Sequence, residues 1–208
     1  SGLLGGEAGV RLSGNSLSLS GNGQVLAGRL GSGADLLTQL DAPDARVGNR
    51  ELNLGSLSLQ DNSTLISTGE LKTPRLDSLS MGAQSGIPTG GDIHLTQAVQ
   101  QIDGTLTSRK DITLQGQQLT INGTVLAKNA LHTESDSLSV GSNGRLEGGQ
   151  SATIKTTTLA NQGVLIGGNT LTLDVPVTQG LGRLVGWNLE VTAPGTYRPG
   201  FSRFNAKN

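Results

Sequence analysis

The chain contains no cysteine and only four aromatic residues among its 208. A chain without cysteine forms no disulfides, which suits a secreted protein that crosses an oxidising compartment unfolded and uncrosslinked. All four aromatic residues lie in the last 22 positions. Residues 1–186 therefore have no aromatic side chain on which a sugar ring could stack, and we do not expect an extended carbohydrate-stacking surface there.

Charge and long apolar segments are also scarce. Charged residues make up 15% of the chain, and the formal net charge is −1, whereas about 25% charged residues is typical. No basic run exceeds two residues, so we do not expect nucleic-acid binding through phosphate neutralisation. No apolar stretch approaches the ~18 residues of a membrane-spanning helix, and no signal peptide precedes Ser1-Gly2, which we interpret as the cut edge of a longer protein.

Glycine, in contrast, is abundant, with 32 residues, and it recurs at regular intervals. Five turn glycines follow one another at a nearly constant period, namely Gly104, Gly123, Gly144, Gly163 and Gly182. Two positions after each of them comes an apolar residue, namely Leu106, Val125, Leu146, Leu165 and Leu184. A Ser-Leu-Ser phrase also recurs, beginning at Ser16, Ser56, Ser78 and Ser137. Such tandem repetition is typical of a solenoid.

Within one repeat the apolar residues alternate with polar ones, as in 111–114 and 119–121. Alternation with a period of two indicates strands with one buried face. The leucine-rich repeat is excluded because its L-x-x-L-x-L-x-x-N signature and its helical stretch are absent. We therefore predict an all-β fold, a parallel β-helix of roughly ten coils of about 20 residues over residues 1–190. Amide side chains at equivalent corners are expected to stack, at Asn129, Gln150, Asn169 and Asn188.

Two segments break the repeat. The step from Gly23 to Ser63 spans two periods, and the segment 27–50 within it is either a degenerate coil or a loop excursion. Insertions in solenoids often carry recognition. The segment 191–208 is interpreted as an irregular C-terminal cap or the start of another module. The candidate partner contacts are the acidic residues of the first segment and the aromatic residues near the C-terminus, namely Asp35, Asp41, Asp44, Trp187, Tyr197, Phe201 and Phe204.

Catalytic and metal-binding patterns are sparse. His94 and His132 are separated by two periods and hence by two coils, so they cannot share one Zn²⁺, and we expect both to face solvent. Asp92 and Asp111 open consecutive repeats and are expected one coil apart. They either cap turns by accepting backbone N–H groups or act as an acid–base pair on a polysaccharide. No motif for a nucleophile, phosphate loop or cofactor is present, so we predict no enzymatic activity, no cofactor and no metal.

The tandem units resemble the haemagglutinin repeats of bacterial two-partner-secretion exoproteins. The likeness is carried by stretches such as Leu119-Thr120-Ile121-Asn122-Gly123-Thr124-Val125 and Leu159-Ala160-Asn161-Gln162-Gly163-Val164-Leu165, and it covers about residues 9–190. That family includes filamentous-haemagglutinin adhesins and the stalks of contact-dependent growth-inhibition toxins. Its N-terminal secretion domain with Asn-Pro-Asn motifs is absent here, as is any toxin domain.

The resemblance implies a right-handed β-helix, secreted through a partner transporter in the outer membrane to the bacterial cell surface. It further implies a shaft segment, a monomeric rod, that contributes to adhesion or to target-cell binding and toxin presentation through a receptor on a bacterial or host cell. Two alternatives are a polysaccharide-acting β-helix lyase or hydrolase that uses Asp92 and Asp111, and a purely structural spacer.

Overall fold

The structure is a computed structural model that describes residues 2–180, 182–191 and 203–205. Over these residues the chain forms one short helix, α1 (Leu36–Leu40), and many short strands. In chain order the strands are β1 (Leu3–Gly6), β2 (Gly9–Leu19), β3 (Gln24–Ala27), β4 (Asn49–Leu59), β5 (Thr64–Ser67), β6 (Leu71–Arg75), β7 (Ser78–Met81), β8 (Gly86–Thr89), β9 (Ile93–Thr96), β10 (Val99–Ile102), β11 (Thr105–Ser108), β12 (Ile112–Ile121), β13 (Thr124–Ala127), β14 (Ala130–Val140), β15 (Arg145–Gly148), β16 (Ser151–Asn161), β17 (Val164–Asp174), β18 (Val177–Gln179), β19 (Arg183–Val191) and β20 (Arg203–Asn205).

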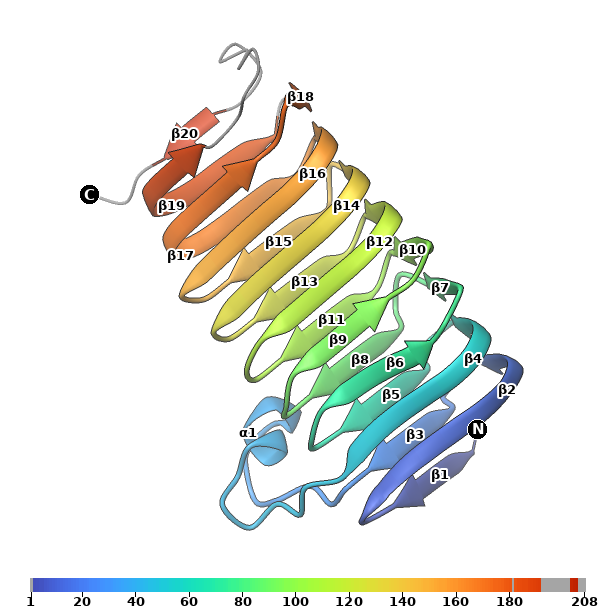
Figure 1. Cartoon of the computed structure of the whole chain (residues 1–208). Coiled ribbons are helices and arrows are strands. Elements are labelled where there is room, and N and C mark those ends of the chain that lie inside the picture. The colour runs from blue at the N-terminus through green and yellow to red at the C-terminus, as the bar shows by residue number, and fades with distance from the viewer. Residues whose placement is uncertain (1, 181, 192–202, 206–208) are drawn as a thin grey trace.

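The strands stack into a parallel β-helix, and Figure 1 shows its successive coils side by side from the N-terminal to the C-terminal end. Three parallel ladders make up its faces. The first ladder runs through β1, β3, β5, β8, β11, β13, β15, the start of β17, the start of β19, and β20. The second and third ladders run through the first and second halves of long bent strands such as β12, β14 and β16, which are replaced by separate short strands such as β9 and β10 in other coils.

The structure confirms the fold class and corrects the interpretation of one segment of the repeat. Successive strands of the first ladder are separated by one period, with one exception: Gln24 pairs directly with Thr64, although two periods lie between them in the sequence. The long step from Gly23 to Ser63 is therefore one coil that contains an excursion, and the interpretation of two periods is wrong. The solenoid has about nine turns of about 21 residues, in agreement with the predicted roughly ten coils of about 20 residues.

The core is a set of aliphatic columns, each made of residues at equivalent positions of successive coils. The five apolar residues that follow the turn glycines form one such column and are all buried. Leu119, Leu138 and Leu159 form another column in the third ladder. Each fully buried aliphatic side chain contributes about 1.5–3 kcal/mol, so stability comes from the stack and not from any single coil.

Turn glycines are required by close packing between coils. A Cβ atom on Gly123 would lie 2.0 Å from the carbonyl oxygen of Gly104 and 2.5 Å from that of Asp103. Real Cβ atoms do not approach backbone so closely, so a side chain here would push neighbouring coils apart. This is the physical reason for the glycine period in the sequence.

The predicted amide column forms only in part. The Nδ2 atom of Asn169 donates to Oε1 of Gln150 at 3.1 Å, and Nδ2 of Asn129 donates to Asp111. Asn188 pairs in register with Thr170 and not with Asn169, because the register shifts between Gly167 and Thr170 in β17. Equivalent positions in two coils therefore cannot be found by counting residues from the turn glycine when one of the coils contains a bulge.

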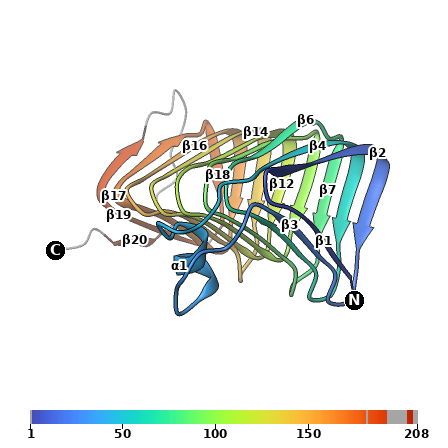
Figure 2. The same ribbon diagram turned by 90° about the horizontal axis from the view of Figure 1, so that it is seen from below.

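Residues 28–48 leave the stack between β3 and β4 and fold beside it, as Figure 2 shows for α1. No helix among the described residues is long and apolar enough to cross a membrane. We call residues 28–48 the excursion. It is the main departure from the repeat within the part of the chain that the structure describes.

Candidate functional site

Two of the predicted contact residues hold the excursion in shape. Asp35 is the N-cap of α1: its Oδ1 accepts the Thr38 backbone N–H at 2.8 Å, completing a capping box. Asp44 accepts hydrogen bonds from the backbone N–H and the hydroxyl of Ser32. Hydrogen bonds from Thr38 lower the pKa of Asp35, and those from Ser32 lower the pKa of Asp44, because they favour the ionised carboxylate.

The third aspartate attaches the excursion to the shaft. Asp41 lies 2.9 Å from Nε of Arg109 and 3.7 Å from Nζ of Lys128, which belong to successive coils. Leu40, at the end of α1, is 2% exposed. Gly90 allows this approach, since a Cβ atom there would lie 2.6 Å from the carbonyl oxygen of Leu40. The excursion is therefore a docked, folded element and not a loose loop.

Docking leaves a groove of about 520 Å³ between α1 and the first ladder. It is lined by Leu36 and Leu37 of α1 together with Pro88 and threonine side chains of the strands. Leu37 is 36% exposed, and Val47, at the end of the excursion, is 69% exposed. The excursion thus displays two apolar side chains outside the stack, whereas most apolar residues of the shaft are buried in its core.

The predicted contact residues do not form one cluster. Asp35, Asp41 and Asp44 share the excursion, but each carboxylate is engaged within the chain. Trp187 lies in β19 at the far end of the stack and is 54% exposed. Tyr197 and Phe201 lie outside the described residues. Phe204 lies in β20, where its backbone pairs in register with Leu184.

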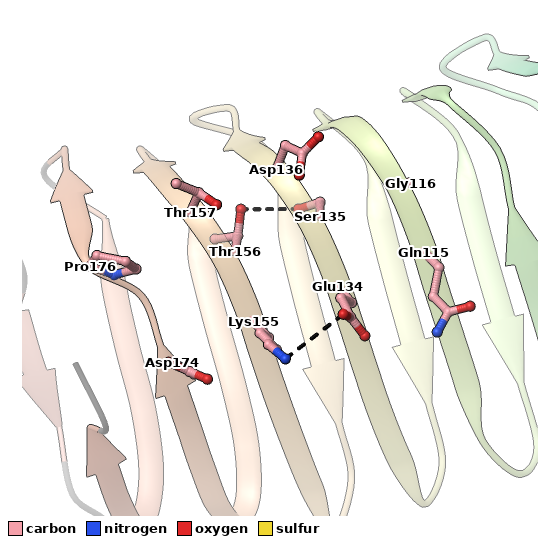
Figure 3. A pocket seen from close by; sticks show the side chains of 10 residues that line it. All are labelled: Gln115, Gly116, Glu134, Ser135, Asp136, Lys155, Thr156, Thr157, Asp174 and Pro176. Carbon is pink, nitrogen blue, oxygen red and sulfur yellow. Dashed lines mark hydrogen bonds and ion pairs between the residues drawn. The ribbon is translucent and has the colours of Figure 1, made fainter. Parts of the chain in front are cut away.

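A second groove, of about 480 Å³, crosses the outer face at the bend between the second and third ladders (Figure 3). Gln115, Glu134 and Lys155 occupy equivalent positions of successive coils along it, and Asp174 continues the column. The Glu134 carboxylate lies 3.8 Å from the Lys155 ammonium. The alternating signs avoid repulsion between like charges one coil apart. Because Glu134, Lys155 and Asp174 recur at the repeat period, their spacing is a signal that could have identified this column from the sequence.

Hydroxyl groups line the base of the same groove. The Ser135 hydroxyl donates to Oγ1 of Thr156 at 3.0 Å, and the Thr156 hydroxyl is 3.1 Å from the Thr158 carbonyl oxygen. The side chains of Ser135 and Thr156 are buried. The hydroxyl groups of Ser135 and Thr156 have hydrogen-bond partners within the chain, and Glu134 is paired with Lys155. The polar residues of this groove therefore connect adjacent coils to one another.

Asp92 and Asp111 lie one coil apart, as predicted, and both hold turns. The Asp111 backbone N–H donates to Oδ1 of Asp92 at 3.1 Å, and the Ala130 backbone N–H donates to Oδ1 of Asp111 at 3.0 Å. Asn129 adds a side-chain hydrogen bond to the same Oδ1 at 2.9 Å. These contacts match the turn-capping role, in which each carboxylate accepts a backbone N–H group at the start of the next coil.

The two histidines are exposed and lie two coils apart, both paired in register with Thr113 of the coil between them. Their neighbours Ile93 and Leu131 are buried, as the alternation predicts. Among residues 2–180, 182–191 and 203–205, no group of three histidine, aspartate or glutamate side chains is close enough to hold a metal ion.

In comparisons with known proteins, no protein-family model, curated protein or solved structure matches the chain.

Proposed function

We propose that this chain is a non-enzymatic shaft segment of a large secreted bacterial surface protein, acting in adhesion or target-cell binding. The observation that carries the proposal is the continuity of the stack: three parallel ladders run through the described coils, and the excursion is docked outside them without interrupting their register. Such a stack is stiff along its axis and presents attached elements at a distance from the cell. The resemblance of the tandem units to haemagglutinin repeats supports the same proposal.

The proposal extends to export and partners. The protein is secreted through an outer-membrane partner transporter, which a chain without cysteine crosses without forming disulfides. It then folds at the cell surface as a monomeric rod and meets a receptor on a bacterial or host cell. The docked excursion is the preferred contact surface, because it displays Leu37 and Val47.

The experiment is flow cytometry of the fluorescently labelled chain on sibling bacteria and on epithelial cells. Saturable binding to bacteria supports a growth-inhibition stalk, and saturable binding to epithelial cells supports a host adhesin. The Leu37→Ser/Val47→Ser variant should lose binding, whereas Val99→Ser should not, because Val99 is comparably exposed at 46% but lies in the third ladder. Binding to neither cell type would reject adhesion and leave the spacer alternative.

The polysaccharide-acting enzyme has weaker support. Its candidate carboxylates, Asp92 and Asp111, are occupied by backbone N–H groups of the following coil. Release of reducing or unsaturated ends from an acidic glycan, abolished in Asp111→Asn, would nevertheless establish it.

A further inference from the structure

One charged side chain lies inside the stack. Arg50 in β4 pairs in register with Val10 of the preceding coil and with Leu71 of the next, so it occupies a column that is otherwise aliphatic at these coils. It is 1% exposed, and its strand neighbour Leu52 is fully buried. An arginine at such a position must satisfy five N–H groups and one positive charge without water.

The chain satisfies only part of that requirement. Nη2 donates to the carbonyl oxygen of Ile66 at 2.8 Å, whereas Nε and Nη1 are buried and have no acceptor. Three N–H groups, one on Nε and two on Nη1, are thus left without a partner. Buried donors of this kind are rare in native proteins and require an explanation.

The positive charge has no partner within the described residues either, since their ion pairs do not include Arg50. Two acidic residues beside Arg50, one next to it in β4 and one in the following coil, pair with other cations: Glu51 with Arg11 at 3.5 Å, and Glu70 with Lys72 at 3.3 Å. Burial lowers the pKa of Arg50 to about 10, which still leaves the guanidinium protonated at neutral pH.

We propose that Arg50 binds a small monovalent anion, chloride in physiological fluids, inside the β-helix. A water molecule would accept an N–H hydrogen bond but would leave the buried charge uncompensated, whereas an anion does both. Arg50 and its neighbours Leu52 and Leu71 are almost completely buried, so an anion that is small and loses its hydration readily is favoured over sulfate or phosphate. The anion binds on the edges of the guanidinium that Ile66 leaves free. This inference does not depend on the proposed function.

The test uses bromide as the probe, because it resembles chloride and scatters anomalously. Urea unfolding of the whole chain is followed by circular dichroism at constant ionic strength while sodium bromide replaces sodium gluconate. A ligand that binds only the folded chain multiplies the folding equilibrium constant about tenfold for each tenfold rise in concentration above its dissociation constant. We expect this response in the parent, together with an anomalous peak beside Arg50 in crystals soaked in bromide.

Two variants separate this site from general salt effects. Arg50→Met should remove the bromide response and the peak, whereas Arg11→Met should retain both, because Arg11 lies on the surface in the preceding coil. Equal stability of the parent in bromide and gluconate, with no peak at the guanidinium, would overturn the proposal even if Arg50→Met did not fold. A bromide response that survives in Arg50→Met would also overturn it.

Discussion

Replacing Leu138 with aspartate tests the register of the whole stack. Leu138 is 1% exposed and is in register with Leu119 and Leu159, so its side chain packs between two leucines of adjacent coils. Truncation at such a position, as in Leu138→Ala, costs about 2–5 kcal/mol because it loses apolar burial and leaves a cavity. Leu138→Asp adds the cost of burying a carboxyl group without a partner, so we expect it to exceed the alanine loss.

The assay is urea unfolding followed by circular dichroism, since Trp187 is exposed and does not report on the core. The matched control is Ser139→Asp, which places the same charge one residue along the same strand on the exposed face. We expect the control to change the free energy of unfolding by less than about 0.5 kcal/mol. If Leu138→Asp unfolded at the same urea concentration as the parent, the assignment of inward and outward faces would be wrong.

Three further predictions concern turns and the excursion. Gly123→Ala should destabilise by more than about 1 kcal/mol, because its Cβ would meet backbone of the preceding coil, whereas Gly14→Ala, with 3.9 Å to its nearest neighbour, should be neutral or slightly stabilising in the same urea assay. Asp41→Asn breaks two ion pairs on the surface, each contributing about 0–1 kcal/mol, so limited proteolysis should cut the excursion faster while the unfolding midpoint hardly moves. Because the folded pKa of Asp35 is lowered, its carboxylate stabilises the α1 cap above pH 3.8, and this support is lost as the pH falls through the lowered pKa. The amide NMR signal of Thr38 should therefore titrate with a midpoint below pH 3.8, and Asp35→Asn should abolish that titration.

The repeat made much of the shaft predictable from the sequence alone. Inward-facing leucines such as Leu106 recur because each coil needs apolar burial, and glycines such as Gly123 recur because adjacent turns approach too closely for a Cβ atom. Both requirements are local and are repeated in every coil, so a one-dimensional pattern records them. The same alternation correctly placed His94 and His132 on the outside, and the spacing correctly placed Asp92 and Asp111 one coil apart.

The candidate site was less predictable. The sequence singled out residues 27–50, but only the tertiary structure decided that they form one docked excursion, because Asp41 meets Arg109 across 68 positions and no local pattern encodes that distance. The carboxylates of Asp35 and Asp44 were expected to be available to a partner, whereas the fold uses them to hold α1 and its loop. Likewise, the alternation of β4 predicts that Arg50 faces inward, but only the surrounding ladders show that the described chain provides no partner for its charge. Sequence periodicity determined the direction of each side chain, and long-range packing determined what each side chain meets.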